Sequence, residues 1–199
     1  MSTVRLLAGY VGGVTCIVAL VIYLQAILRG KASSNRTTWG VWIFVTAFLG
    51  IYYYQTVGFA NTIWVSFSYF VGTLMVFIFL LLFTEKGQWT WVEKTAVVCL
   101  VITLVLYAMF HLQPIMALYL TMFVDLVGTI PLVQAVYNDP RTEHGPAWYL
   151  GLFANVINLL AVEKWDYPNA GYPIWLLLMT LTVSVLIRFP KLRFRTSSL

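Results

Sequence analysis

The chain is dominated by long apolar runs that alternate with short polar segments. A membrane-spanning helix needs roughly 20 predominantly apolar residues, because its backbone N–H and C=O groups must pair within the segment. The short connections leave no room for a separate soluble domain. The pattern predicts an all-α polytopic membrane protein with seven spanning helices, near residues 6–28, 39–55, 62–83, 95–110, 115–137, 147–161 and 172–187.

Composition supports a membrane environment. Of the 199 residues, 61% are hydrophobic and only 10% are charged, whereas a soluble domain has about 25% charged residues. The first apolar run is longer than the core of a signal peptide, and no small-residue cleavage site follows it, so we expect a retained first helix. Cys16 and Cys99 both lie inside apolar runs, which predicts neither a disulfide framework nor a metal site.

The basic residues predict the orientation of the helices. With seven spans, ten of the twelve Lys and Arg residues fall on one side of the membrane, and only Arg5 and Lys164 fall on the other. The positive-inside rule then places the N-terminus outside and the C-terminus in the cytoplasm, and we expect the cell membrane as the location. The ten are Arg29, Lys31, Arg36, Lys86, Lys94, Arg141, Arg188, Lys191, Arg193 and Arg195.

Aromatic residues near the predicted helix ends are typical of the belts that anchor a protein at the membrane surface. On the predicted inner side these are Trp89, Trp91 and Trp148, and on the outer side Trp64, Trp165 and Trp175. Tyr52, Tyr53 and Tyr54 approach the outer interface and are expected to belong mostly to this belt.

A weak internal repeat divides the chain. A shift of 109 positions aligns two apolar helices with a Gln near the inner end, each followed by a loop with Arg-Thr and a helix that opens with Trp. Both copies start from the outside, so they are parallel repeats and the fourth helix is the extra crossing. This predicts a 3+1+3 architecture: a three-helix bundle over 1–94, a linker helix over 95–114 and a second three-helix bundle over 115–199. The aligned pairs are Val18 with Val127, Gln25 with Gln134, Ala26 with Ala135, Trp39 with Trp148 and Phe44 with Phe153.

The fifth helix and its loop resemble a known unit. Residues 128–135 (GTIPLVQA), followed by 138–142 (NDPRT), are similar to the helix-plus-loop unit of the PQ-loop membrane proteins, which include the SWEET sugar transporters and cystinosin. The resemblance implies a seven-helix transporter fold and a hinge at Pro131 and Gln134. In this chain two residues separate that Pro from the Gln, and the first repeat has Ile22 at the position of the proline.

Asp125 is the most informative single residue. It lies near the middle of the fifth predicted span, where exposure of a carboxyl group to lipid costs at least ~2.5 to 3.5 kcal/mol, so we expect it to face the bundle interior or a wet cavity. No Lys, Arg or His lies at the same depth, and burial without a counter-charge favours the neutral, protonated carboxyl group. Asp125 is therefore predicted to couple proton movement to a solute. The alternative is a buried carboxyl group that only ties helices together.

Further polar side chains are predicted at a similar depth. Asn155 and Asn158 share one face of the sixth helix, and their amides suit hydroxyl-rich ligands, although they are equally suited to hydrogen bonds between helices. Thr46 corresponds to Asn155 in the first repeat. Trp42 lies one helical turn deeper than Trp39 and is positioned to stack on a sugar or base ring. We predict a substrate site formed by Asp125, Asn155, Asn158, Thr46 and Trp42.

The residue inventory argues against an enzyme. The two histidines, His111 and His144, are predicted at opposite membrane faces, so they cannot share a metal, and neither a metal nor a cofactor is expected. A single membrane-buried Asp does not make an aspartyl-protease pair, and the last helix has no Lys for a retinal Schiff base.

Two function classes remain open at this stage. The first is a small-solute transporter that works by alternating access on a neutral, sugar-like or riboside-like substrate, with protons as a coupled partner. The second is a receptor or structural membrane protein of the same architecture that transports nothing. The expected partners are the lipid bilayer, a small neutral solute and protons, and no nucleic acid is expected. Neither the identity of the solute nor the oligomeric state follows from the sequence.

Overall fold

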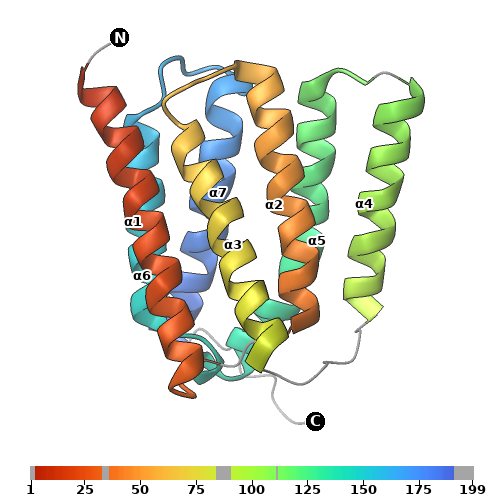
Figure 1. Cartoon of the computed structure of the whole chain (residues 1–199). Helices are drawn as coiled ribbons and strands as arrows, with labels where there is room; N and C mark the ends of the chain where they lie inside the picture. Colours follow the sequence, from red (N-terminus) through yellow and green to blue (C-terminus); the bar gives the residue numbers. More distant parts are fainter. Residues whose placement is uncertain (1–2, 33–35, 84–90, 111, 191–199) are drawn as a thin grey trace, which may run out of the picture.

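The computed structural model describes residues 3–32, 36–83, 91–110 and 112–190. This part of the chain contains seven α-helices, one short 3₁₀ helix and no strand (Figure 1). The prediction of an all-helical protein is confirmed, and every predicted span corresponds to one helix. The helices are α1 (Thr3–Leu28), α2 (Arg36–Val57), α3 (Ile63–Phe83), α4 (Trp91–Phe110), α5 (Pro114–Asn138), η1 (Pro140–Thr142), α6 (Gly145–Leu160) and α7 (Tyr167–Arg188).

Five of these helices, α1, α2, α3, α5 and α7, are long and apolar enough to cross a membrane. In α4 the apolar part is shorter, over Val97–Met109. The 16 residues of α6 correspond to about 24 Å of helix, less than the ~30 Å of a bilayer core. Large apolar side chains are exposed on the outside of all seven α-helices. An exposed apolar surface of this extent is typical of a membrane-embedded protein.

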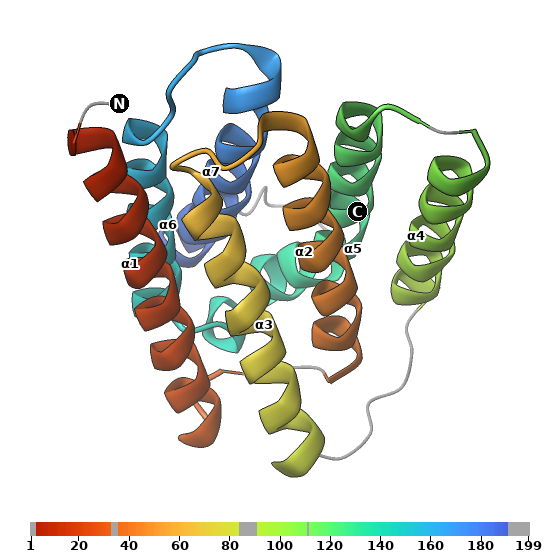
Figure 2. The same cartoon turned by 45° about the horizontal axis from the view of Figure 1, so that its top comes forward.

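The helices of the two halves have matching neighbours. In the first half α3 packs against α1 and α2, and in the second half α7 packs against α5 and α6. Between the halves, α1 packs against α6 and α2 packs against α5. Helix α4 lies at the edge of the bundle, where it packs mainly against α5 (Figures 1 and 2).

Glycines allow α1 to approach its neighbours closely. A Cβ atom on Gly9 would collide with the backbone carbonyl of Asn61. A Cβ atom on Gly12 would lie 3.3 Å from the Ala154 carbonyl oxygen in α6, and one on Gly13 would lie 3.1 Å from the Trp64 carbonyl oxygen in α3. Small residues at such contacts let helix backbones pack tightly in an apolar solvent.

Two tyrosines expected in the outer aromatic belt lie in the core instead. Tyr52 and Tyr53 are 2% and 0% exposed, whereas Tyr54 is 50% exposed. The Tyr53 hydroxyl donates a hydrogen bond to the Asn169 carbonyl (2.9 Å) and pairs with the Thr62 hydroxyl. The belt prediction is therefore wrong for Tyr52 and Tyr53, because α2 packs Tyr52 against Tyr107 of α4 and Tyr53 against Tyr172 of α7 within the core.

Candidate functional site

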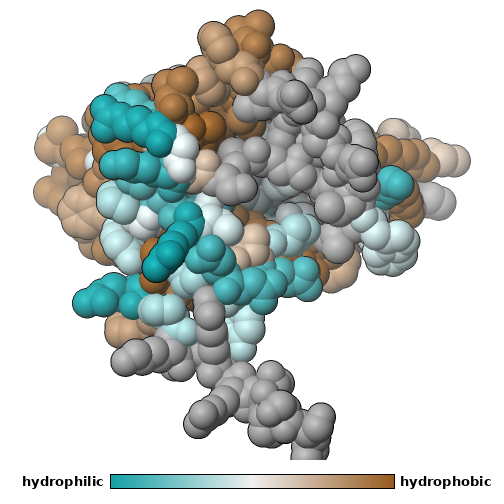
Figure 3. All heavy atoms as spheres, turned by 90° about the horizontal axis from the view of Figure 1, so that it is seen from below, coloured by the Kyte–Doolittle hydropathy of each residue, from teal (hydrophilic) through white to brown (hydrophobic). Residues whose placement is uncertain are grey.

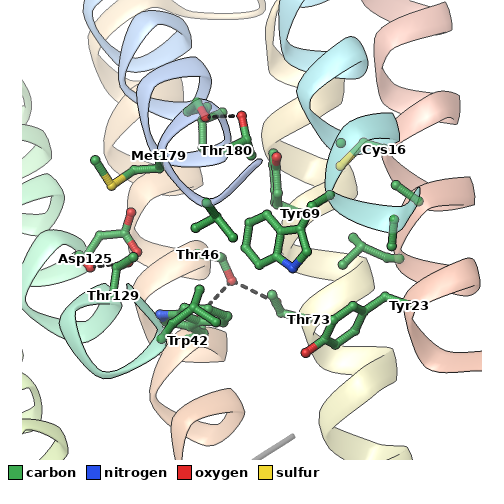
Figure 4. Close-up of a pocket in the computed structure, with 18 of the residues that line it drawn as sticks. Cys16, Tyr23, Trp42, Thr46, Tyr69, Thr73, Asp125, Thr129, Met179 and Thr180 are labelled. Atoms are coloured by element: carbon green, nitrogen blue, oxygen red, sulfur yellow. Dashed lines mark hydrogen bonds between the residues drawn. The ribbon is translucent and has the colours of Figure 1, made fainter. Parts of the chain in front are cut away.

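A cavity of about 130 Å³ lies inside the bundle, between the two halves. Side chains from α1, α2, α3, α5, α6 and α7 line it. In Figure 4, Asp125 and Thr129 of α5 lie on one side of the cavity, and Cys16 and Tyr23 of α1 lie on the other. Of the predicted site residues, the structure brings Asp125, Thr46 and Trp42 together in this lining.

A tryptophan on α7 makes a hydrogen bond to the carboxyl group of Asp125. The indole Nε1 of Trp175 in α7 donates a hydrogen bond to Asp125 Oδ2 at 2.9 Å. Trp175 was expected in the outer aromatic belt, and that prediction is wrong, because the ring points inward from α7. Among the described residues that line the cavity, Asp125 is the only Asp, Glu, Lys, Arg or His. The site thus contains one carboxyl group without a cationic neighbour in its lining.

The hydroxyl groups of the lining are mostly used within the protein. Thr46 Oγ1 donates to the Trp42 carbonyl (2.8 Å) and pairs with Thr73 Oγ1 (3.0 Å). Thr129 Oγ1 donates to the Asp125 carbonyl and Thr180 Oγ1 to the Leu176 carbonyl, each at 2.8 Å. Such bonds to the preceding helical turn are common for Thr in membrane helices.

The indole of Trp42 differs from these hydroxyls. Its Nε1 is buried and donates to no acceptor in the described residues. Trp42 also packs edge-on against Trp39, with ring centroids 5.3 Å apart. The lining therefore offers a free hydrogen-bond donor next to aromatic faces.

Asn155 and Asn158 are fully buried but are not part of the cavity lining. Asn155 Nδ2 donates to the Tyr69 hydroxyl (2.7 Å) and the Thr180 hydroxyl (3.1 Å), and both partners do line the cavity. Asn155 thus positions two side chains of the cavity lining without being exposed to the cavity itself. Both amide atoms of Asn158 have no hydrogen-bond partner among the described residues, and its backbone lies close to Gly12 of α1.

The predicted hinge residues lie further along α5. Pro131 is inside the helix, which continues unbroken to Asn138. Because proline has no N–H, it removes the hydrogen bond to the Val127 carbonyl and weakens the helix one turn past Asp125. Gln134 is exposed, and neither Pro131 nor Gln134 lines the cavity, although Leu132 between them does.

A buried acid that the sequence analysis did not single out lies at the end of the cavity where α1 ends and α6 begins. Glu143 is 7% exposed, and its carboxylate accepts hydrogen bonds from the Tyr23 hydroxyl (3.1 Å) and the Trp148 indole (2.9 Å). Both donors line the cavity, so Trp148 is not the surface anchor that we expected. Burial raises the pKa of Glu143 from 4.5 to about 7, although the Trp148 and Tyr23 hydrogen bonds oppose this.

Replacement of each asparagine by leucine distinguishes their roles. In Asn155→Leu the Tyr69 hydroxyl loses its partner, so we expect a loss of about 1 to 2 kcal/mol in the free energy of unfolding. In Asn158→Leu an unpaired buried amide is removed, so stability should be unchanged or higher. Unfolding in mixed detergent micelles measures both variants. Equal destabilisation of the two, or the reverse order, contradicts these roles.

Stability should depend on pH through Glu143. A carboxyl group whose pKa is raised by folding adds stability that is complete below about pH 4.5 and is lost as the pH rises through about 7. At ~1.36 kcal/mol per pKa unit, the loss is on the order of 3 kcal/mol. Unfolding measured between pH 4.5 and 8 should show this loss in the parent, and Glu143→Gln should abolish it.

The matched control for this experiment is Glu163→Gln. Glu163 also accepts a side-chain hydrogen bond, from Asn61 at 2.8 Å, but at the opposite end of the bundle. The control should keep the pH dependence of the parent. If Glu143→Gln keeps it as well, the assignment to Glu143 is wrong.

Comparison with known proteins adds no relative from which a role could be transferred. No family model matches the chain, and no curated protein or solved structure is significantly similar to it. The resemblance of the fifth helix and its loop to the PQ-loop proteins remains a prediction from the sequence. The part of the chain that the structure describes is thus all-helical and apolar, with a carboxyl-bearing cavity lined by α1, α2, α3, α5, α6 and α7.

Proposed function

We propose that this protein is a small-solute membrane transporter that works by alternating access. The observation that carries the proposal is the cavity at the centre of the bundle, with Asp125 near the middle of α5. Ionisable groups at this depth are costly and usually serve solute or proton pathways. A cavity that lies between two halves of a protein is also where rocking of the halves opens a site to either side.

The packing of the helices supports a 3+1+3 arrangement. If α1, α2 and α3 correspond to α5, α6 and α7, the contacts of α3 with α1 and α2 correspond to those of α7 with α5 and α6. The α1–α6 contact then corresponds to the α5–α2 contact. This is the neighbour pattern of two parallel repeats related by an axis along the membrane normal. In this proposal α4 is a linker helix whose extra membrane crossing lets the second repeat start on the same side of the membrane as the first.

At each end of the bundle, hydrogen bonds join the two halves. At one end Tyr23 of α1 bonds to Glu143, and at the other Tyr53 of α2 bonds to the Asn169 carbonyl of α7. Asn61 donates to Glu163 at this second end. In alternating access these two sets of hydrogen bonds break in turn, while the Gly13 contact between α1 and α3, which lies within the first half, is kept.

The basic end of the bundle is assigned to the cytoplasm. Arg29, Lys31, Arg141 and Arg188 lie at the end where α1 and α7 finish, and Figure 3 shows hydrophilic residues on this face. By the positive-inside rule the N-terminus is then outside, and the site is reached from the cytoplasm past Glu143.

The proposed substrate is a small solute whose movement is coupled to a proton carried by Asp125. The sequence suggested a neutral, sugar-like or riboside-like molecule. Uptake into proteoliposomes, with and without a pH gradient, tests transport across a panel of sugars, ribosides, amino acids and amines. We expect uptake of at least one solute and stimulation by the gradient.

In Asp125→Asn the stimulation should disappear and the rate should fall at least about tenfold, because the amide cannot carry the proton. The control Asp139→Asn changes an exposed acid at the start of η1, where Asn also caps well, and should transport normally. No uptake of any solute by a folded protein would favour the alternative, a receptor or structural protein.

A further inference from the structure

The charge of the cavity indicates what kind of solute it accepts. An ionised Asp125 has no Lys, Arg or His beside it in the lining, as far as the structure describes the chain. Trp175 donates a hydrogen bond to Oδ2 but brings no charge, and Oδ1 accepts no hydrogen bond from a described residue. A half-buried carboxyl group without a partner either keeps its proton or, when ionised, pairs with a positive charge. The missing partner is a positive charge, which a solute can supply.

Aromatic rings form much of the remaining wall. Trp42, Trp148, Tyr69 and Tyr172 line the same cavity, together with Trp39 and Tyr23. The faces of such rings attract a cation that has been removed from water, and tryptophan does so most strongly. A carboxylate among aromatic faces therefore suits an ammonium group better than an uncharged one.

The supply of hydrogen bonds does not suit a polyhydroxylated solute. Thr46, Thr129 and Thr180 already donate to backbone carbonyls, and the asparagine amides lie outside the lining. Two polar groups on lining side chains have no hydrogen-bond partner among the described residues, Trp42 Nε1 and the Tyr172 hydroxyl. The indole N–H can donate to one hydroxyl or carbonyl oxygen of a solute. A solute with one positive charge and one acceptor oxygen can therefore pair with Asp125 and with one of these two groups.

The size of the cavity limits the solute to a small molecule. Its volume of about 130 Å³ is close to the ~150 Å³ of an apolar protein cavity that holds a benzene molecule. Larger drug-sized ligands occupy sites of roughly 300 to 1,000 Å³. A tetramethylammonium ion or a short amino alcohol is of the size that the cavity holds.

We propose that the solute of this site is a small organic cation, with its ammonium group held by Asp125 and the aromatic wall and its oxygen held by Trp42. This inference rests on the proposed function and replaces the neutral solute by a cationic one. It also explains why the described lining holds no cationic side chain, since a Lys or Arg beside Asp125 would repel the solute.

Equilibrium binding to the purified protein in lipid nanodiscs tests the proposal. The probes are choline and its uncharged analogue 3,3-dimethylbutan-1-ol, which has the same shape. We expect choline to bind at least about 30-fold more tightly than the alcohol. Equal affinity for both, or binding of the alcohol alone, would overturn the proposal.

Two pairs of variants separate the contributions of charge and ring. Asp125→Asn should weaken choline binding at least about 100-fold and leave binding of the alcohol unchanged, and Asp125→Glu should restore part of the loss. Trp42→Leu should weaken choline binding about 10- to 30-fold, whereas Trp42→Phe, which keeps a ring but loses the indole N–H, should weaken it less. The thermal unfolding midpoint of each variant shows that it is folded, and unchanged choline affinity in folded Asp125→Asn refutes the site.

Uptake assays distinguish failure of this inference from failure of the proposed function. Uptake of a sugar or riboside that choline does not inhibit would keep the transporter and refute the cationic substrate. Tight choline binding without uptake of any solute would keep the cation site and refute transport.

Discussion

Close packing of helix backbones is the constraint on which this structure depends. A helix in hydrocarbon gains little by turning apolar side chains away from an equally apolar solvent, so contact between backbones and a few polar bonds must hold the bundle together. Gly9, Gly12 and Gly13 bring α1 onto α3, α6 and the connection at Asn61. Because α1 belongs to the first half and α6 to the second, this packing also fixes how closely the two halves approach.

The polar groups then have distinct positions and tasks. Tyr23, Tyr53 and Asn61 make hydrogen bonds between the halves at the two ends of the bundle. Asn155 makes its bonds behind the cavity wall. Asp125 is left at the centre with one tryptophan donor. Hydrogen bonds thus join the two halves at the ends of the bundle. At the centre, Asp125 keeps one carboxyl oxygen that is free to bind a proton or a cation.

The helices were predictable because each apolar run is long enough to be read without knowledge of its neighbours. Asp125, Thr46 and Trp42 were predictable members of the site because depth follows directly from position within a run. The same argument placed Asn155 and Asn158 at the right depth, but depth does not give the direction in which a side chain points around the helix. The structure turns both amides away from the cavity.

Contacts between distant residues were not predictable. Trp175 and Trp148 looked like interfacial anchors because they lie near helix ends, and only the packing of α7 against α5 and of α6 against α1 directs their rings inward. Glu143 was not singled out, because in the sequence it lies in the short polar connection between two predicted spans. Its burial follows from its place beneath Tyr23, 120 residues earlier in the chain.

The central claim is that the cavity is reached in turn from the two sides of the membrane. The most direct measurement is modification of Thr46→Cys, in a protein with Cys16→Ser and Cys99→Ser, by a membrane-impermeant thiol reagent on sealed vesicles of either orientation. The lipid-facing Phe44→Cys, two residues away, is the matched control, since Phe44 is 59% exposed on the outside of the bundle. The account predicts that Thr46→Cys is modified from both sides and Phe44→Cys from neither. Modification of Thr46→Cys from one side only, or from neither, would contradict alternating access.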